Sequence, residues 1–360
     1  MANLSFNETS EYLALGLMSG TSLDGLDIVC AAFVLKNGKW SFSIKASETI
    51  NYSDSWVDKL RFANQLNKEA LISLDQEYGL FLGLAVKKFL LSINEKPDLI
   101  ASHGHTVFHQ PESGYTLQIG AGDEIFSLVN IPVVYNFRIA DVELGGQGAP
   151  LVPIGDKLLF GENEACLNLG GFANISFETE GERKAFDICP VNTILNLYAS
   201  KLGFQYDRNG EISRTGKIQV DLLKRLNNLN YYRQSFPKSL AREWLEDQFL
   251  PEISQKEYPV KDIMATVCEH IAIQISDITN NYGLKNMLVT GGGAFNKYLL
   301  EILSSYSQSK LILPDPEIIN FKEALVFAFM GILKFRNEIN CLASVTGAER
   351  DSVCGVLAGI

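Results

Sequence analysis

The sequence predicts an α/β protein built from two related domains. A strand, a glycine-rich turn and a second strand open the chain, and the same order returns after residue 163. Helical patterns of apolar residues accompany both copies. A crossing rich in glycine and proline, 132–153, lies between them. We therefore expect two α/β domains that face a cleft, with a boundary near that crossing.

Composition and charge narrow the class of protein. The chain has 360 residues, 46% of them hydrophobic and 20% charged, which suits a globular protein of two domains. Its net charge of −11 argues against a broad surface for nucleic acid or anionic membranes. The six cysteines show no CxxC spacing, so we expect reduced core thiols and no zinc site. With no leader pattern and no apolar stretch long enough to cross a bilayer, we expect a cytoplasmic protein.

The first half of the chain predicts strands followed by a long helix. Apolar runs indicate strands at 13–18, 26–35 and 41–50, and a helical period covers 67–93. A short buried strand at 99–102 then runs into a polar loop.

The second half repeats the alternation of strand and helix. Residues 164–179 and 183–203 contain strands, and Asn192 and Gly203 are expected to begin and end the helix of the second segment. The apolar residues of 261–283 recur at helical spacing. A strand, three glycines and a helix fill 286–300, and a last helix is expected at 320–335 with Asn320 as its N-cap.

Three glycine turns carry the functional signal: Ser19–Gly25, Gly170–Asn174 and Gly291–Asn296. Glycine lets successive backbone N–H groups approach a ligand, which suits a phosphate chain. Any one of these turns alone is explained as well by tight geometry. The sequence has neither a GxxxxGK[ST] loop nor a GxGxxG between strand and helix. The remaining hypothesis is a nucleotide that is held between two domains by glycine-rich loops.

The chain resembles the anhydro-N-acetylmuramic acid kinase family from residue 16 to about 348. The matching segments are GLMSGTSLDGLDIV (16–29), SHGHTVFHQP (102–111), LQIGAGDEI (117–125), GGQGAPLVP (145–153), LNLGGFANIS (167–176), YDRNGEISRTG (206–216), TGGGAFN (290–296), KEALVFA (322–328) and SVTGA (344–348). The resemblance implies the actin, hexokinase and sugar-kinase superfamily, in which two ribonuclease-H-like domains surround a nucleotide cleft. It implies an N-terminal domain of 1–140 with about 341–360 and a C-terminal domain of 141–340.

The resemblance also implies an activity. The family hydrolyses the 1,6-anhydro bond of 1,6-anhydro-N-acetylmuramic acid and phosphorylates the 6-oxygen from ATP, giving N-acetylmuramic acid 6-phosphate and ADP in peptidoglycan recycling. Two alternatives stay open: a kinase for another anhydrosugar, and a silent relative that binds nucleotide or sugar. The implied partners are ATP, Mg²⁺ and the anhydro amino sugar. We expect no nucleic-acid or membrane partner, and a homodimer is left open.

By resemblance, Asp187 is the general base that activates water. Glu323 is a second carboxylate for holding that water, or the N3 residue of a capping box behind Asn320. Asp24 would lie near the metal that accompanies ATP. The implied nucleotide-binding residues are Gly20, Thr21, Ser22, Leu23, Asp24, Gly25, Leu26 and Asp27 in the first phosphate loop, Gly170 and Gly171 in the second, and Gly291, Gly292 and Gly293 against the adenosine.

The implied sugar-binding residues are His103, Gln118 and Arg138. An arginine among apolar residues, as at Arg138, usually has a partner or a ligand. His103, His105 and His109 resemble a metal cluster, but no acidic or thiol ligand accompanies them. The resemblance implies that this loop forms a wall of the sugar pocket.

The chain departs from the family near the expected base. The family pattern FDTGPGN is here FDICPVN, so Ile188, Cys189 and Val191 replace a threonine and two glycines. If either glycine position required a positive φ, a branched valine would be costly there. Elsewhere His105 replaces a glutamine and Asn136 an aspartate. These changes leave the expected fold untouched and bear on substrate and activity.

Overall fold

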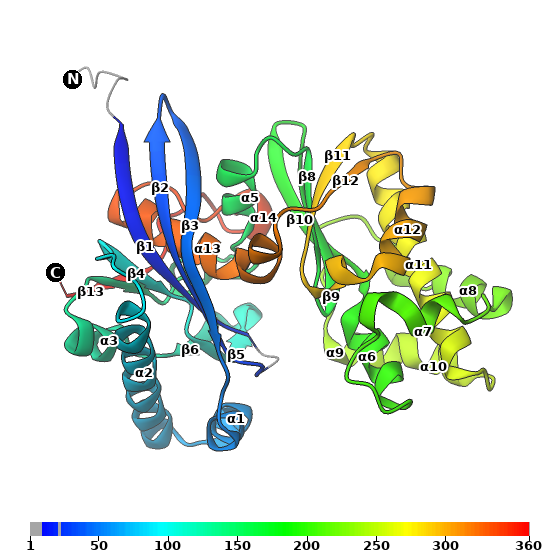
Figure 1. Ribbon diagram of the computed structural model, residues 1–360, viewed down its shortest axis with the longest axis horizontal. Helices are drawn as coiled ribbons and strands as arrows, with labels where there is room; N and C mark the ends of the chain where they lie inside the picture. Colours follow the sequence, from blue (N-terminus) through cyan, green and yellow to red (C-terminus); the bar gives the residue numbers. More distant parts are fainter. Residues whose placement is uncertain (1–8, 21–22, 360) are drawn as a thin grey trace. The chain divides into compact units, whose positions relative to one another are not determined.

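The computed structural model describes residues 9–20 and 23–359 (Figure 1). The chain divides into two compact units, Met1–Leu159 with Phe321–Ile360, and Phe160–Asn320. We call them unit 1 and unit 2. Residues 141–159 and 321–340 pack within unit 1, whereas the sequence places them in the second domain. The assignment of each phosphate loop to a domain stays a prediction.

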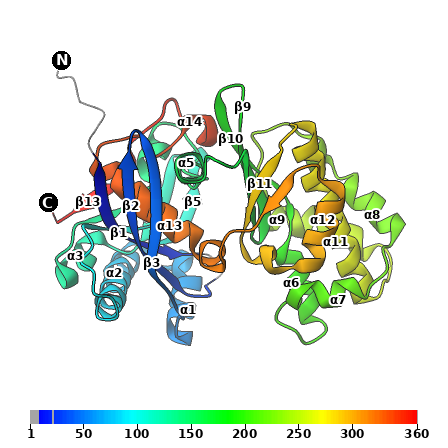
Figure 2. The ribbon, with the colours of Figure 1, turned by 45° about the horizontal axis from the view of Figure 1, so that its top comes forward.

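Unit 1 is built on a mixed sheet of six strands. The order is β13-β7-β4-β1-β2-β3, and β4 runs parallel to β1. Strands β1 to β3 form an antiparallel meander (Figure 2). The strands are β1 (Ser10–Ser19), β2 (Leu26–Lys36), β3 (Lys39–Ile50), β4 (Leu99–Ser102), β7 (Val133–Tyr135) and β13 (Val356–Ala358). A separate hairpin joins β5 (His105–Gln110) to β6 (Tyr115–Ile119).

Helices cover both faces of this sheet. Successive side chains of β1 point to opposite faces, and both sets are apolar, so each face needs a helix to bury it. Leu15 and Leu17 join the core that α2 (Lys68–Leu90) buries. The opposite face receives α13 (Pro316–Phe335), whose Phe329 stacks on Phe33. The other helices and short helical turns of unit 1 are α1 (Asp54–Arg61), η1 (Ala63–Gln65), η2 (Pro111–Ser113), α3 (Gly122–Val129), α4 (Ile139–Glu143), α5 (Pro153–Leu159) and α14 (Ala343–Thr346).

Gly16 allows β1 and α13 to pack backbone against backbone. A Cβ at this position would lie 1.8 Å from the carbonyl oxygen of Ala324. We expect Gly16→Ala to lower the free energy of unfolding by about 3 kcal/mol, because one of two packed backbones must move. Thermal and urea unfolding of the purified variant measure this. An unchanged transition would show that the helix is not packed this closely.

Unit 2 repeats the strand order of unit 1. Its sheet runs β10-β9-β8-β11-β12, with β8 to β10 antiparallel and β11 and β12 parallel to β8. The strands are β8 (Ala165–Leu169), β9 (Phe172–Thr179), β10 (Glu182–Pro190), β11 (Asn286–Thr290) and β12 (Lys310–Ile312). Two sheets that each begin with an antiparallel meander and add parallel strands beside the first strand confirm the predicted pair of related α/β domains.

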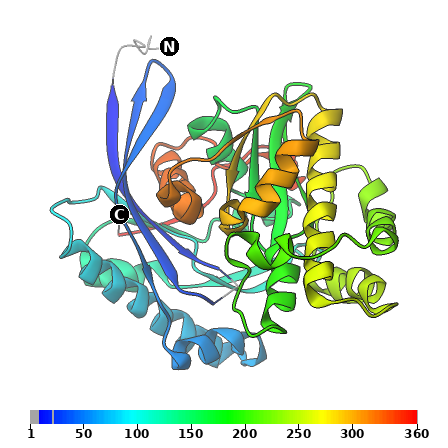
Figure 3. The ribbon, with the colours of Figure 1, turned by 45° about the vertical axis from the view of Figure 1, so that its right-hand side comes forward.

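Helices α11 (Val260–Asn281) and α12 (Lys297–Tyr306) lie side by side in unit 2 (Figure 3, yellow and orange). The apolar residues of α11 that recur at helical spacing enter the core of this unit, as predicted. The remaining helical segments are α6 (Asn192–Ser200), η3 (Arg208–Gly210), α7 (Glu211–Arg214), α8 (Val220–Asn227), η4 (Asn230–Arg233), α9 (Arg242–Trp244), the π-helical turn η5 (Leu245–Phe249), α10 (Leu250–Ser254) and η6 (Gly292–Phe295). The six cysteines are buried and free, as expected.

Two helix starts differ from prediction. Helix α6 is preceded by Val191 as N-cap, and the Asn192 amide instead donates to the carbonyl of Leu169 at 2.9 Å. Helix α13 begins at Pro316, four residues earlier than expected. Proline at a first helical position costs no hydrogen bond, so the earlier start is favourable. Asn320 is therefore inside the helix, and the capping box proposed for Glu323 is wrong.

Candidate functional site

Two of the predicted glycine turns meet at one end of the unit 2 sheet. Gly171 follows β8, and its carbonyl accepts the N–H of Val191 at 2.8 Å. Gly291 ends β11 at φ +79°, and a Cβ there would lie 2.4 Å from Asn168 Oδ1 and 2.8 Å from the Leu169 backbone. Glycine is required at this position both for its φ and for the close approach. The two turns therefore form one continuous backbone surface.

A hollow of about 480 Å³ opens beside these turns, within the range of small-molecule sites. Its lining is rich in amides, and two exposed rings border it, those of Tyr206 and Phe295. The lining residues are Asn192, Leu195, Asn196, Tyr206, Asp207, Arg208, Asn209, Gly292, Phe295, Asn296 and Asn320. A planar, polar group such as a nucleobase suits this combination of amides and aromatic rings.

Asp187 lies in β10, three residues before the strand ends. It pairs with Asn174 of β9, and the register then shifts at a β-bulge before Cys189. A bulge re-aims the side chains beside it, and bulges are frequent near active sites. Burial raises the pKa of the Asp187 carboxyl, and the Leu240 N–H, which donates to Oδ2 at 2.8 Å, lowers it. Asp187 is thus a half-buried carboxylate near the same end of the sheet as the glycine turns.

The substitutions beside Asp187 are accommodated without positive φ. Ile188 is the extra residue of the bulge and is 1% exposed. Cys189 and Val191 are buried, and neither is among the described residues of positive φ. Val191 has φ −126°, and a Cβ on Gly293 would meet its Cγ1 at 3.4 Å. Its side chain therefore fills core space behind the Gly291–Gly293 turn, and the glycine positions of the family need no glycine here.

The first glycine turn lies in unit 1, between β1 and β2. The Leu23 N–H donates to the Gly20 carbonyl at 3.3 Å, and Leu23 has φ +61°, an uncommon value for leucine. Its side chain packs against the unit 1 core, which holds it in that conformation. Thr21 and Ser22 lie outside the described residues.

The two aspartates of this turn differ in exposure. Asp24 is exposed, whereas Asp27 is partly buried and accepts the Thr49 hydroxyl at 2.6 Å. Burial raises the pKa of Asp27, and the Thr49 hydrogen bond opposes this. Among the described residues no three acidic, histidine or cysteine side chains form a metal cluster. One exposed carboxylate fits a Mg²⁺ ion that arrives with phosphate oxygens and water, the mode this ion favours with nucleotides.

The buried His103 and the partly buried Arg138 form a pair in unit 1. Arg138 donates to His103 Nε2 from Nε (3.2 Å) and from a terminal nitrogen (2.9 Å), and to the Gly148 carbonyl (2.8 Å). His103 Nδ1 lies 2.9 Å from the Gly104 carbonyl, so the proton is assigned to Nδ1. Burial and the arginine lower the pKa of His103 to about 3. The histidine is neutral and orients the guanidinium.

The Gly148 turn is held by a second buried group. Asp141 accepts the Gly148 N–H at 2.7 Å through Oδ2 and the Thr346 hydroxyl at 2.7 Å through Oδ1. The Gln147 N–H in turn donates to the Thr346 carbonyl at 2.8 Å. The segments 145–153 and 344–348, both part of the resemblance, thus meet at Asp141 and support Arg138.

Glu323 follows a buried ion pair in the sequence. Lys322 lies 2.6 Å from Asp156 and is almost fully buried, whereas solvent reaches the Glu323 side chain. Surrounding protein raises the pKa of Glu323, Lys322 and Arg138 lower it, and Asp27 raises it. Glu323 is therefore an acid close to the charged groups of the first turn and of Arg138, with no capping role.

The side-chain oxygen of Gln118 lacks a hydrogen-bond donor among the described residues. Gln118 Nε2 donates to the Thr116 hydroxyl at 2.8 Å, and the side chain is 5% exposed. Oε1 is buried with no hydrogen-bond partner among the described residues. A buried acceptor without a donor costs free energy, and a ligand hydroxyl would relieve it. This supports the predicted role of Gln118 toward a sugar.

The other two histidines of this loop point to a structural role. His105 Nδ1 lies 3.2 Å from Ser19 Oγ, which also accepts the Tyr52 hydroxyl at 2.8 Å. Burial lowers the pKa of His105 to about 4. His109 Nδ1 lies 3.2 Å from the Thr116 hydroxyl. His105, which replaces the family's glutamine, therefore supports the residue that leads into the first glycine turn.

Asn136 has φ +55°. Asparagine is among the residues that tolerate this region best, so the change from the family's aspartate carries no backbone penalty.

The sequence analysis did not identify three residues that contact Asp187: Tyr231, Lys238 and Leu240. The Tyr231 hydroxyl donates to the Asp187 carbonyl at 2.6 Å. Their segment carries a cluster of aromatic residues and a proline, YYRQSFPKSL at 231–240. Three aromatic residues in an otherwise polar segment without regular secondary-structure pattern suggest that the segment packs against something. This is the signal by which it could have been identified.

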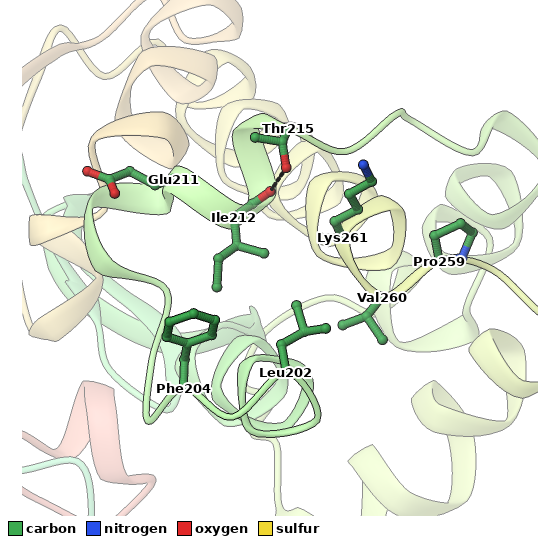
Figure 4. Close-up of a pocket in the computed structure, with 8 residues that line it drawn as sticks. All are labelled: Leu202, Phe204, Glu211, Ile212, Thr215, Pro259, Val260 and Lys261. Carbon is green, nitrogen blue, oxygen red and sulfur yellow. Dashed lines mark hydrogen bonds between the residues drawn. The ribbon is translucent and has the colours of Figure 1, made fainter.

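A second hollow of about 650 Å³ lies elsewhere in unit 2 and is almost entirely apolar (Figure 4). Leu202 and Phe204 face Ile212 and Val260 across it. With few polar groups to orient a ligand, it does not resemble a catalytic site. Within the described residues, no helix has both the length and the apolar character that a bilayer crossing demands.

Comparison with known proteins identifies the family. The sequence profile described as anhydro-N-acetylmuramic acid kinase matches residues 12–359. Proteins of that name from Aliivibrio fischeri and Synechococcus elongatus are 32% and 34% identical, each match covering 95% of this chain and 98% of the relative. A ROK family glucokinase structure from Streptomyces griseus, in complex with glucose and AMPPNP, has a TM-score of 0.41 at 11% identity and covers 88% of this chain and 98% of its own. The chain belongs to the anhydro-N-acetylmuramic acid kinase family.

Proposed function

We propose that the chain is an ATP-dependent kinase that opens 1,6-anhydro-N-acetylmuramic acid with water and phosphorylates its 6-oxygen, and so takes part in peptidoglycan recycling. Family membership over residues 12–359 supports the activity. The observation that carries the site is the gathering of Asp187, Gly171 and Gly291 at one end of the unit 2 sheet, beside a hollow of nucleoside size.

In the proposed reaction, Asp187 takes a proton from a water molecule that attacks the anomeric carbon. The bond between that carbon and the 6-oxygen breaks, and the 6-oxygen attacks the γ-phosphorus of ATP. ADP leaves with the electrons of the broken phosphoanhydride bond. Positioning and charge stabilisation supply most of the catalysis in phosphoryl transfer. Glu323 is proposed to hold the same water.

The nucleotide and sugar are assigned to different groups. Gly170 and Gly171 bind phosphate oxygens through backbone N–H groups, and the Gly291–Gly293 turn lies against the nucleoside. Gly20 to Asp27 form the other phosphate loop, and Asp24 is proposed to hold Mg²⁺, which neutralises phosphate charge when bound. His103, Gln118 and Arg138 recognise the sugar, with the Gln118 Oε1 accepting a sugar hydroxyl.

A coupled assay tests the function. The purified chain is mixed with ATP, Mg²⁺ and 1,6-anhydro-N-acetylmuramic acid, and ADP release is followed together with the product mass. The proposal expects a product that has gained both one water and one phosphate. If ADP formed only with another anhydrosugar, that sugar would replace 1,6-anhydro-N-acetylmuramic acid as the proposed substrate. Ligand binding without any turnover would indicate a silent relative and overturn the proposal.

A further inference from the structure

The segment Tyr231–Leu240 surrounds Asp187 with hydrogen bonds. The Tyr231 hydroxyl donates to the Asp187 carbonyl at 2.6 Å. The Asp187 N–H donates to the Lys238 carbonyl at 3.3 Å, and the Leu240 N–H donates to Asp187 Oδ2 at 2.8 Å. All three polar groups of one residue, its N–H, its carbonyl and its carboxylate, are thus engaged by one stretch of chain.

Strand β10 is the edge strand of the unit 2 sheet and also contains a β-bulge, so its backbone groups need partners from outside the sheet. Asp187 pairs with Asn174 and Cys189 with Ala173, so Ile188 is an inserted residue and the ladder is interrupted next to Asp187. A bulge leaves backbone groups without their ladder partners. Buried backbone groups need other partners, and the segment supplies them. The carboxylate direction therefore depends on residues that lie 44 to 53 positions away in the sequence.

Aromatic contacts fix the segment to the unit 2 core. The Phe236 ring stacks on that of Phe186, the neighbour of Asp187, with centroids 5.5 Å apart and planes 6° from parallel. Tyr231 packs on Trp244 at 5.3 Å. Lys238 Nζ lies 4.7 Å from the centroid of the Tyr231 ring and donates to the Tyr231 carbonyl at 3.3 Å. These contacts leave little freedom to the groups that face Asp187.

The neighbouring Tyr232 is anchored in another direction. Its hydroxyl lies 2.9 Å from His270 Nε2 on α11, and His270 Nδ1 contacts the Asn227 side chain. Burial lowers the pKa of His270 to about 3, so this pair is neutral. Of these two adjacent tyrosines, Tyr231 therefore places its hydroxyl on the Asp187 carbonyl, and Tyr232 places its hydroxyl on His270 in the core.

We propose that the segment Tyr231–Leu240 positions the proposed general base, with the Tyr231 hydroxyl fixing the backbone at the bulge and the Leu240 N–H fixing the carboxylate. The inference rests on the proposal that Asp187 is the base. Tyr231 and Leu240 are positioning residues, since each acts through Asp187. The arrangement supplies what a base requires, a fixed direction and an ionised carboxylate.

Electrostatics are consistent with this arrangement. Burial raises the pKa of Asp187, and a hydrogen bond from an N–H to the carboxylate favours the ionised form. The other titratable groups that interact with this site are Cys189, Tyr231 and Lys238. Burial raises the pKa values of the thiol and the phenol, and it lowers that of Lys238. Of these, the cysteine and the tyrosine are uncharged at neutral pH.

Tyr231→Phe tests the backbone contact, and Tyr232→Phe is its matched control. Each removes one hydroxyl from adjacent tyrosines of η4. We expect Tyr231→Phe to lower kcat about tenfold while KM for ATP stays within twofold, because the base is misaligned and the nucleotide groups are unchanged. Tyr232→Phe should keep kcat within about twofold. Equal kcat values for the two variants at comparable melting temperatures would overturn the role of Tyr231.

Leu240→Pro tests the carboxylate contact because proline has no N–H to donate. Losing that donor raises the pKa of Asp187, so the acid limb of kcat/KM against pH should move to higher pH. Ser239→Pro is the control, since it places the same ring one residue earlier and keeps the Leu240 N–H. A merely structural role would reduce activity without moving the limb. An unmoved limb in an active Leu240→Pro enzyme contradicts the proposal.

Asp187→Asn separates the two proposals. If Asp187→Asn is inactive but Tyr231→Phe and Leu240→Pro behave like their controls, the positioning role fails and the base stands. If Asp187→Asn retains turnover, the assignment of the base fails, whatever the segment variants show.

Discussion

Asp187→Asn should lower kcat by about 10²–10⁴-fold while ATP binds with nearly unchanged affinity. Asparagine keeps the shape of the side chain and an oxygen that accepts the Leu240 N–H, but it cannot take the proton of the attacking water. The affinity for ATP depends on other groups, the glycine turns and the hollow beside them. ADP release in single-turnover mixtures and calorimetric titration with ATP measure the two quantities.

Asp262→Asn provides the matched control. Asp262 is a buried aspartate in the first turn of α11 in unit 2, and it accepts the Lys217 N–H at 2.9 Å. We expect it to affect stability and to leave kcat within about twofold. Turnover by Asp187→Asn close to that of the wild type would remove Asp187 from the mechanism.

The same carboxylate sets the pH dependence. The base acts when ionised, and burial raises its pKa above the ordinary value of 3.8. Activity should therefore be full at neutral pH and fall as pH drops through that raised pKa, earlier than for an exposed aspartate. A profile of kcat/KM between pH 4 and 8 measures this with the wild-type enzyme, with buffers chosen to keep the protein folded.

Gly291→Ala should destabilise unit 2 and weaken nucleotide binding. Its φ of +79° costs a side chain about 1–3 kcal/mol, and the clash with Asn168 and Leu169 adds a cost of similar size. We expect a lower unfolding midpoint and weaker nucleotide binding together, because the turn and the end of β8 must separate. Urea unfolding and ATP titration of the same preparation measure both.

Gly292→Ala is the matched control in the same turn. It has no positive φ, and the nearest atom to a Cβ there is Asn192 Nδ2 at 3.5 Å. The fold should tolerate this methyl group, although it projects from a residue that lines the hollow. We therefore expect near wild-type stability and a raised KM for ATP. Equal loss of stability in the two variants would contradict the geometry described for the turn.

Local pattern was sufficient to predict the long helices and most strands of the two main sheets. The strand at 99–102 has the predicted bounds, and the long helix predicted at 67–93 is α2, Lys68–Leu90. Alternation and helical spacing are short-range signals, so they survive without knowledge of the tertiary structure. Helix α13 was predicted to start at Asn320 because asparagine is a good cap, but Pro316 begins it. Capping preference is weak beside the burial of a whole helix.

The candidate site was less accessible to sequence reasoning. The glycine turns could be identified because glycine marks positions that tolerate no side chain, and Gly291 bears this out in its geometry. Val191 stands where the family pattern has a glycine, which raised the question of a positive φ at this position. Its φ is −126°, so the valine is compatible with the backbone there. Tyr231 and Leu240 could not be found, since their contacts with Asp187 span more than forty residues and leave no periodic trace.

The most direct test of the account is the position of solvent oxygen in the product. Wild-type enzyme is incubated with ATP, Mg²⁺ and 1,6-anhydro-N-acetylmuramic acid in water enriched in ¹⁸O, and the product is analysed at once by mass spectrometry and ³¹P NMR. The account predicts one ¹⁸O at the anomeric carbon and none in the phosphate on the 6-oxygen. Label in the phosphoryl group, or phosphorylation that leaves the anhydro bond intact, would contradict it.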